Sequence, residues 1–474
     1  MELNKLTIKQ AYDGLKAGDF TSVELTKACL KQIKKRNPDL NAFISVFEDE
    51  ALAEAKEADK KIKAGKQEML TGIPFAVKDA ICTADRRSTA AAKILDNYVP
   101  SYDATVIKKI REQGAVLIGK NNCDSFGHGA SNENSMYGPV KNPHDLTRVA
   151  GGSSGGTAVA VADHMCIFGI AEDTGGSIRY PASFCGIVGL RPSYGRNSRF
   201  GIMPMASSLD TVGPMGKTVE DCALLQEIIA GHDPLDATTA DVEVSKYTNN
   251  LKIKRLKNLK IGVPKEYFSL EGMDRETRDI VNSKIERLKD LKIDIVPVSL
   301  PMTKYAIAVY YIIVPCEDSS NLSRMDGIRY GVRKNSKDLY NTYATTRARG
   351  FPEEVKRRIM IGTYALSAGY YDAYYKKAQK VRTLIIQDFE KVFQKVDLLV
   401  TPTSPFPAFK IGEKVSNPLA MYLTDVFVGP AAVAGLPAIS VPAGKTKAGL
   451  PVGLQIIGPR MGEEKIFQLA KLVS

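Results

Sequence analysis

The sequence has no tryptophan and only four histidines and seven cysteines among its 474 residues. The cysteines are scattered, and no two of them form a Cys-x-x-Cys pair. Zinc clusters and disulfide frameworks need regularly spaced cysteines, so we expect neither a metal site nor disulfides. The pattern favours buried thiols in a reducing compartment, with a catalytic cysteine as the alternative.

Targeting signals and long hydrophobic runs are also missing. The opening segment MELNKLTIKQAYDGLK is charged, so we expect neither a secretory leader nor a transit peptide. The longest uncharged stretch begins at Val426, and prolines and glycines interrupt it. A membrane helix needs about 20 helix-compatible apolar residues, so we expect no membrane span and a cytoplasmic protein.

The composition is that of a globular protein, with 44% hydrophobic and 25% charged residues. Enough apolar surface is available for a packed core, which argues against disorder as the main state. The formal net charge of +12 has two interpretations that the composition leaves open. It indicates either affinity for a polyanion or solubility alone.

The order of predicted elements indicates an N-terminal helical segment followed by an α/β core. Within residues 1–70, the helix over 21–37 begins with Thr21 and Glu24 at a capping-box spacing. From residue 71 onward, short apolar strands alternate with helical patterns, which predicts a sheet covered by helices on both faces. We expect one domain over 1–474, with a boundary near 240 as the alternative.

The densest chemical signal is a pair of glycine-rich turns that both contain serine. GGSSGG occupies residues 151–156 and precedes a helical segment, while TGGS at 174–177 follows an apolar strand. Glycine lets successive backbone N–H groups converge, which suits an oxyanion and makes a neighbouring serine a candidate nucleophile. A flexible linker and a phosphate-binding nest are the alternatives for GGSSGG.

A serine nucleophile needs a base, and none of the four histidines stands in a recognisable triad setting. Lysine takes this role when it is neutral, and Lys78 at the end of the apolar run GIPFAVKDAI is the candidate. The alternative is a lysine at a solvated strand end. GGSSGG also matches a nucleophile elbow and residues 114–121 nearly match a phosphate loop, but their contexts are wrong for both motifs.

These motifs resemble the amidase signature family. The resemblance rests on Lys78 in a VKD context, on GGSSGG, and on DTGGSIR with PASFCG over 173–186. It extends almost end to end, through segments such as SNENSMYGPVKNP and EVKRRIM. Within the family, the chain is similar to the glutaminase subunits of tRNA-dependent amidotransferases. The resemblance implies a large mixed β-sheet covered on both faces by α-helices.

The resemblance also implies catalytic roles. Ser177 is the expected nucleophile, and Ser153, preceded by a cis peptide bond, is the expected bridging serine. Lys78 is the expected neutral base. The backbone N–H groups of Thr174, Gly175, Gly176 and Ser177 are the expected oxyanion hole.

The expected substrate is glutamine, whose charged α-groups need partners of opposite charge. The resemblance assigns Arg358 to the carboxylate, with Arg357 as the alternative, and Asp425 to the amine. Tyr310 and Ser131 are further expected contacts. For Arg358 and Asp425 the alternative is a surface ion pair. Whether glutamine or asparagine is preferred stays open.

The implied reaction releases ammonia that converts Glu-tRNA(Gln) to Gln-tRNA(Gln). The implied partners are B-type and C-type subunits in a heterotrimer, with misacylated tRNA bound through the complex. No cofactor is expected in this chain, and ATP and Mg²⁺ are expected at the partner subunit. Asp-tRNA(Asn) as a further target stays open. A stand-alone amidase is the main alternative, and a basic nucleic-acid-binding protein without catalysis is the other.

Some positions depart from the family's usual residues. His144 replaces a tryptophan and Ala150 replaces a proline. Glu172 stands where a small residue is common, two residues before the TGGS turn, and Tyr180 replaces a common glutamine. We expect Glu172 to influence the pKa of nearby groups.

Overall fold

The computed structural model describes residues 2–251 and 259–474. An eleven-stranded mixed sheet runs through the molecule in the order β1-β3-β2-β6-β8-β7-β12-β13-β11-β9-β10, and a two-stranded sheet joins β4 and β5. The strands are β1 (Phe43–Val46), β2 (Pro74–Lys78), β3 (Val116–Asn121), β4 (Lys141–Asn142), β5 (Asp145–Val149), β6 (Phe168–Asp173), β7 (Val188–Arg191), β8 (Thr211–Gly216), β9 (Lys260–Pro264), β10 (Asp294–Val298), β11 (Leu398–Pro402), β12 (Ala438–Lys445) and β13 (Pro451–Ile457).

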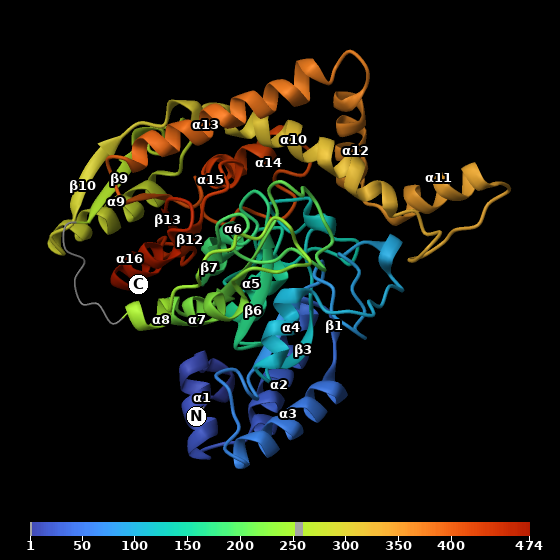
Figure 1. Cartoon of the computed structure of the whole chain (residues 1–474), viewed down its shortest axis with the longest axis vertical. Coiled ribbons are helices and arrows are strands. Elements are labelled where there is room, and N and C mark those ends of the chain that lie inside the picture. Colours follow the sequence, from blue (N-terminus) through green and yellow to red (C-terminus); the bar gives the residue numbers. More distant parts are fainter. Residues whose placement is uncertain (1, 252–258) are drawn as a thin grey trace.

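Helices surround this sheet (Figure 1). They are α1 (Ile8–Ala17), α2 (Ser22–Leu40), α3 (Glu48–Lys63), α4 (Thr105–Glu112), α5 (Gly155–Ala162), α6 (Arg179–Cys185), α7 (Val219–Ile229), α8 (Tyr247–Asn250), α9 (Arg275–Asp290), α10 (Ala306–Asn321), α11 (Leu339–Gly350), α12 (Glu353–Leu366), α13 (Lys377–Phe393), α14 (Pro418–Tyr422), α15 (Gly429–Val433) and α16 (Glu463–Val473). Among the described helices, none is long and apolar enough to cross a membrane.

The N-terminal helices form as the sequence predicts. Thr21 and Glu24 make a reciprocal capping box at the start of α2, and the helix continues past the predicted end at residue 37 to Leu40. Leu25, Cys29 and Ile33 are buried along one face of α2. Helices α1–α3 lie at the opposite end of the molecule from α10, α12 and α13 (Figure 1).

Both faces of the sheet are covered, as the alternation of strands and helices predicts. Ile439 and Val441 on β12 belong to the apolar cluster that includes α7, α9 and α16. Ala438 on the same strand belongs to the cluster that includes α10, α13 and α15. Successive residues of a strand point to opposite faces, so β12 is buried from both sides.

The polar region near residue 240 does not interrupt the sheet. Strand β7 from the first half of the chain pairs antiparallel with β12 from the second half, through Leu190 and Ile439 among others. The two halves therefore contribute to one sheet. Residues 252–258, part of the segment that suggested a boundary, lie outside the described residues.

Three neighbouring strands set the position of the glycine-rich turns. β2 pairs in parallel with β3 on one side and with β6 on the other. The carboxyl ends of parallel strands meet at one edge of a sheet, where such folds bind their ligands. Lys78 is the last residue of β2 and Asp173 the last of β6, so the lysine and the turn at 174–177 come to the same edge.

Candidate active site

Lys78 is buried and contacts one of the predicted serines. Its side chain is only 1% exposed, and its Nζ atom donates a hydrogen bond of 2.7 Å to Ser153 Oγ. The alternative of a solvated lysine at a strand end is therefore wrong. The peptide bond between Gly152 and Ser153 is cis, as the family resemblance implies.

The second serine-containing turn is tied to the first by the backbone. The N–H group of Ser154 donates to the carbonyl of Ser177 at 3.2 Å. The Ser154 hydroxyl donates to the carbonyl of Glu172 at 3.1 Å. Helix α5 starts directly after Ser154, so GGSSGG is an ordered connection into a helix rather than a linker. The structure thus joins Lys78, Ser153 and the Ser177 turn in one buried unit.

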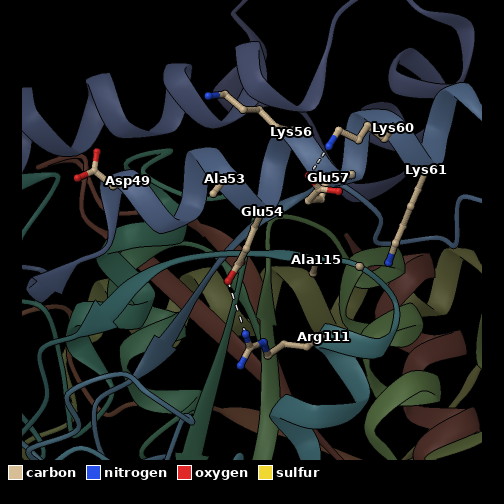
Figure 2. Close-up of a pocket in the computed structure, with 11 residues that line it drawn as sticks. Asp49, Ala53, Glu54, Lys56, Glu57, Lys60, Lys61, Arg111 and Ala115 are labelled. Atoms are coloured by element: carbon tan, nitrogen blue, oxygen red, sulfur yellow. Dashed lines mark hydrogen bonds and ion pairs between the residues drawn. The ribbon is translucent and has the colours of Figure 1, made fainter.

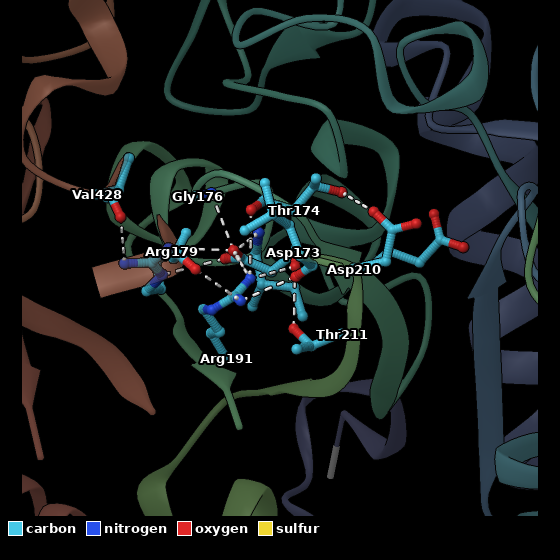
Figure 3. Close-up of polar contacts among 12 residues, drawn as sticks. Asp173, Thr174, Gly176, Arg179, Arg191, Asp210, Thr211 and Val428 are labelled. Atoms are coloured by element: carbon cyan, nitrogen blue, oxygen red, sulfur yellow. Dashed lines mark hydrogen bonds and ion pairs between the residues drawn. The ribbon is translucent and has the colours of Figure 1, made fainter. Parts of the chain in front are cut away.

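Asp173 anchors the turn from below (Figure 3). Its carboxylate accepts hydrogen bonds from the N–H groups of Gly176 at 2.9 Å and Ile178 at 3.1 Å. It also pairs with the buried guanidinium groups of Arg179 at 3.1 Å and Arg191 at 2.9 Å. Burial alone would raise the pKa of Asp173, but the two arginines lower it well below the ordinary value. The anchor is therefore a carboxylate at neutral pH.

The Gly176 amide is therefore already occupied. The predicted oxyanion hole used the N–H groups of Thr174, Gly175, Gly176 and Ser177, but the Gly176 N–H points to Asp173. In the part of the chain that the structure describes, the other three amides have no hydrogen-bond acceptor. They are the donors that remain available to a ligand.

The glycines of this turn are required by space. A Cβ atom on Gly175 would lie 2.5 Å from the Tyr310 ring, and one on Gly176 would lie 2.3 Å from the Val428 side chain. Gly176 also has a φ angle of +135°, which L-residues rarely adopt. Tyr310, a predicted substrate contact, thus packs directly on the turn.

Histidine is not the base of this site. The His128 ring lies 2.9 Å from Asp318 through Nε2, and its Nδ1 contacts the carbonyls of Ser125 and Phe126. His144 contacts the carbonyl of Cys185, and His232 contacts a threonine hydroxyl. No histidine ring contacts a serine hydroxyl within residues 2–251 and 259–474. Lys78, by contrast, contacts the hydroxyl of Ser153 in the first glycine-rich turn.

The cysteines do not offer a reactive thiolate. All seven are buried and unpaired. Burial raises the pKa of the Cys29 thiol to about 12 and that of Cys316 to about 11. A thiol must ionise to act as a nucleophile, so the catalytic-cysteine alternative loses its support. No cluster of three metal-ligating side chains occurs among the described residues.

A polar cavity of about 110 Å³ contains two of the four predicted substrate contacts, and Tyr310 and Asp425 are not among its lining residues. Ser131, Arg358 and Tyr311 are among the residues that line it. The Ser131 hydroxyl is buried and has no hydrogen-bond partner among the described residues. Arg358 is only 3% exposed, whereas Arg357 is 43% exposed. Arg358 is therefore the buried cation at this cavity, and the surface-pair alternative fits Arg357 instead.

Aromatic side chains and one carboxylate hold Arg358 in place. Its guanidinium lies 5.0 Å from the Tyr311 ring centre and 5.5 Å from that of Tyr422. Its Nε donates to Glu354 at 2.8 Å. The Tyr311 hydroxyl donates to Asp425 at 2.8 Å, so the cation and the predicted amine partner share one tyrosine. Burial raises the pKa of Asp425 to about 7.

Tyr310 was predicted as a contact from the sequence, whereas Tyr311, Glu354 and Tyr422 were not. One signal was available, for Glu354. Glu354 precedes Arg358 by four residues, the spacing of a helical ion pair, and both lie on α12. Tyr311 directly follows Tyr310, but adjacent helix positions diverge by about 100°, so the pattern does not say which ring faces which neighbour.

A larger cavity of about 570 Å³ borders α3 and the segment from Arg111 to Ala115 that precedes β3 (Figure 2). It shares no residue with the site described above. Its charged side chains largely neutralise one another, as Lys60 with Glu57 at 2.6 Å and Arg111 with Glu54 at 3.6 Å. Nothing in it resembles a nucleophile and base, so the candidate active site is the one around Lys78.

Comparisons with known proteins agree with this geometry. The family model described as "Amidase" matches residues 24–467. The A-type subunit of the glutamyl-tRNA(Gln) amidotransferase of Thermodesulfovibrio yellowstonii is 53% identical, with 99% of this chain and 97% of the relative covered. The protein of the same name from Geobacter metallireducens is 52% identical, with the same coverage.

A crystal structure of the A-type subunit of the Thermotoga maritima glutamyl-tRNA(Gln) amidotransferase is also similar. Its TM-score is 0.82 at 41% identity, and 99% of this chain and 94% of that chain are covered. A structure described as an amidase aligns with a TM-score of 0.82 at 29% identity, covering 98% of each chain. On the family match and these full-length relatives, the chain belongs to the amidase signature family.

Proposed function

We propose that the chain is the glutaminase subunit of a tRNA-dependent amidotransferase. It hydrolyses the side-chain amide of glutamine, and the ammonia converts Glu-tRNA(Gln) to Gln-tRNA(Gln). The observation that carries the proposal is the 2.7 Å contact between Lys78 Nζ and Ser153 Oγ beside the turn that holds Ser177. The 53% identity over 99% of the chain to an amidotransferase subunit supports the choice of substrate.

Ser177 is the proposed nucleophile. Its Oγ atom attacks the amide carbon of glutamine, and its proton passes through the Ser153 hydroxyl to the unprotonated Lys78 amine. The proton then returns by the same route to the leaving nitrogen, so that ammonia departs as the C–N bond breaks. Water attacks the glutamyl ester in a second step and restores Ser177. A positioned proton relay of this kind contributes roughly a factor of 10² to 10⁴ in rate.

The amides of Thr174, Gly175 and Ser177 are the proposed oxyanion donors. They are the amides of the turn without an acceptor in the described structure. Each such donor contributes about 3 kcal/mol to stabilising the transition state. Asp173 uses the Gly176 amide to fix the shape of the turn, so the donors need no rearrangement when the charge develops.

Arg358 and Asp425 are the proposed partners of the α-carboxylate and the α-amino group of glutamine. Ionic hydrogen bonds are strong in a buried site, where water does not compete. Tyr311 holds Asp425 by a 2.8 Å hydrogen bond and lies against Arg358. The buried Ser131 hydroxyl and Tyr310, which packs against Gly175, complete the proposed contacts.

The proposed partners are B-type and C-type subunits, which form a heterotrimer with this chain. ATP and Mg²⁺ act at the partner subunit, where misacylated tRNA also binds, and no cofactor is assigned to this chain. We place the complex in the cytoplasm. The support for these assignments is the identity of the chain to full-length amidotransferase subunits.

The test is ammonia release from glutamine by the full chain together with its B-type and C-type partners. We expect Ser177→Ala to abolish release while the complex still assembles. A slow glutamine analogue should leave a glutamyl adduct on Ser177 that mass spectrometry detects. Retained turnover in Ser177→Ala would refute the nucleophile assignment. Parallel assays with asparagine determine which donor is preferred.

A stand-alone amidase is the second candidate. The observation that favours it is the similarity to the amidase structure, with a TM-score of 0.82 at 29% identity. This alternative predicts turnover of simple amides by the isolated chain and no association with partner subunits. Co-purification from cells, followed by assays with glutamine and with simple amides, separates the two functions.

A further inference from the structure

Glu172 is a buried carboxylate beside the proposed base, and the reaction described above does not use it. Its Oε2 atom lies 3.4 Å from Lys78 Nζ, and its side chain is only 8% exposed. Its Oε1 atom is buried and has no hydrogen-bond partner among the described residues. The carboxylate is therefore directed at the lysine and at little else.

The backbone fixes the position of this carboxylate. Glu172 lies in β6 and pairs with Val212 of β8. Its carbonyl accepts the hydrogen bond of the Ser154 hydroxyl. Glu172 lies in a paired strand and not in a loop. The pairing of the strands therefore fixes its position relative to Lys78.

Charged groups on neighbouring elements act on this pair. Burial is the largest cause of the shift at Glu172 and raises its pKa to about 7. Lys78 opposes this increase, Asp210 before β8 adds to it, and Lys120 on β3 opposes it. The other titratable groups that interact with the pair are Cys82, Cys123 and Asp124.

A carboxylate next to a catalytic lysine creates a chemical problem, because an anion ordinarily favours the ammonium form, which cannot accept a proton. In a buried pair the proton has a second location. Transfer from nitrogen to the carboxylate oxygen replaces two buried charges by two neutral groups. Burial disfavours separated charges. The neutral pair of amine and carboxylic acid is therefore more populated in a buried site than it would be in water.

We propose, within the function proposed above, that Glu172 accepts a proton from the Lys78 ammonium group across their 3.4 Å contact and so frees the Lys78 amine to act as the base. The lone pair on Nζ then faces Ser153, which lies 2.7 Å away. Glu172 acts through Lys78 and does not contact the substrate. It is a positioning residue for a proton.

The proton count balances in each step. The N–H bond of the Lys78 ammonium breaks and an O–H bond forms on Glu172, so that both groups become uncharged while the net charge of the pair stays zero. The Ser177 proton then moves through Ser153 to Nζ as the bond from Oγ to the amide carbon forms. It returns through Ser153 to the leaving nitrogen as ammonia departs. Glu172 keeps its proton throughout, so the pair starts every cycle in the same state.

The test measures nucleophile activation directly, without glutamine and without partner subunits. Phenylmethanesulfonyl fluoride reacts with an activated serine: the Oγ–S bond forms, fluoride leaves, and the serine proton passes to the base. The second-order rate constant of labelling at Ser177, located by mass spectrometry, is measured against pH for the full-length wild type and variants. A pH profile reports proton positions that a purely structural role would not move.

In the wild type we expect the labelling rate to fall as the pH decreases through about 7, because below its pKa Glu172 already holds a proton from solvent and cannot take one from Lys78. Glu172→Gln keeps the shape and removes the proton acceptor. We expect this variant to be labelled at least tenfold more slowly at pH 7, with the rise in rate moved to higher pH. Glu172→Asp should recover part of the rate, because it restores a carboxylate.

The matched control is Glu463→Gln, which removes a different buried carboxylate, one that accepts the Ser193 N–H far along the chain from Lys78. We expect wild-type labelling in this variant. Thermal unfolding of every variant shows whether the fold is retained, and Glu172→Asp provides the comparison if Glu172→Gln unfolds. A Glu172→Gln protein that is labelled as fast as the wild type, or faster, with an unchanged pH profile would overturn the inference.

The same assay separates this inference from the proposed function. Labelling that depends on Glu172, in a protein that releases no ammonia from glutamine, would refute the proposed substrate and still support proton transfer between Lys78 and Glu172. Ammonia release together with labelling that is independent of Glu172 would refute only the proposed proton transfer to Glu172. A wild type that is not labelled at Ser177 at any pH would overturn the pair together with the nucleophile assignment.

Discussion

Asp173 offers the sharpest test of how the fold shapes the site. Its carboxylate pairs with Arg179 and Arg191, both without solvent exposure, and it accepts the amides of Gly176 and Ile178. Asp173→Asn keeps the size of the side chain and removes its charge. Two buried guanidinium groups then lose their common counter-ion, while an amide oxygen remains for some of the hydrogen bonds.

The expected loss of stability follows from the burial of the pair. Removing one partner of a buried ion pair costs about 3–5 kcal/mol, because an uncompensated charge stays behind. A chain of 474 residues has an unfolding entropy of roughly 1 kcal/mol/K, so the melting temperature should fall by about 3–5 °C. Ammonia release should also fall, because the turn that carries Ser177 loses its anchor.

The contribution of Asp173 to the free energy of unfolding depends on pH in a definite direction. The pKa of Asp173 is lowered in the folded protein by the two arginines, despite its burial. A carboxyl group with a depressed folded pKa contributes stability that is fully present above its unfolded pKa of about 3.9. That contribution is lost as the pH falls through the lower folded pKa. The difference between the wild type and Asp173→Asn should therefore be constant from pH 5 to 8 and shrink only in strong acid.

Differential scanning calorimetry and an ammonia assay on the same preparations measure both effects. Asp233→Asn is the matched control, since Asp233 is a buried carboxylate that accepts the hydroxyls of Ser198 and Thr105 and forms no ion pair with an arginine among the described residues. It should lose about 1–2 kcal/mol and keep its activity. If Asp173→Asn matches this control in both measurements, the anchoring role of Asp173 is refuted.

Three further outcomes test the site. Lys78→Ala should reduce the kcat of ammonia release at least as much as Ser153→Ala, by roughly 10²-fold or more, because it removes the base itself; a smaller loss would argue against a lysine base. Arg358→Met should raise the KM for glutamine more than tenfold, whereas Arg357→Met, whose side chain is 43% exposed, should not. Equal effects of the two substitutions in substrate titrations would contradict the assignment. The KM should rise as the pH falls through about 7, where Asp425 becomes protonated and loses its charge for the α-amino group, and Asp425→Asn should raise it at every pH.

The sequence allowed much of this site to be predicted because its residues lie in local motifs. The turn at 174–177 requires glycine for reasons of space and φ angle, so a short run of consecutive residues is enough to predict it. The capping box of Thr21 and Glu24 is local for the same reason. Lys78 was ambiguous from spacing alone, since a strand end is either buried or solvated, and only packing by the rest of the chain decides this.

Features that depend on distant residues were not predictable in this way. The pairing of β7 with β12 joins segments about 250 residues apart, and no local pattern specifies it. The Gly176 amide is a local exception, because it was assigned to the oxyanion hole although Asp173, only three residues earlier, accepts its hydrogen bond. The contact between Tyr311 and Asp425 spans 114 positions and depends on how α10 packs.

The distances between the side chains of the site depend on the register of the strands more than on the loops. β2 and β6 supply the base, its carboxylate neighbour and the anchored turn, so their relative position sets the distance from Lys78 to Glu172. Phe75 and Phe168 are paired in this register, and their rings stack at 5.3 Å with an angle of 11° between planes. A register slip of one residue would separate the rings and turn each side chain of the strand to the other face. A shift of β2 that displaced Lys78 would also break the stacking of these two rings in the core. The buried aromatic pair therefore helps to fix the positions of the side chains at the strand ends.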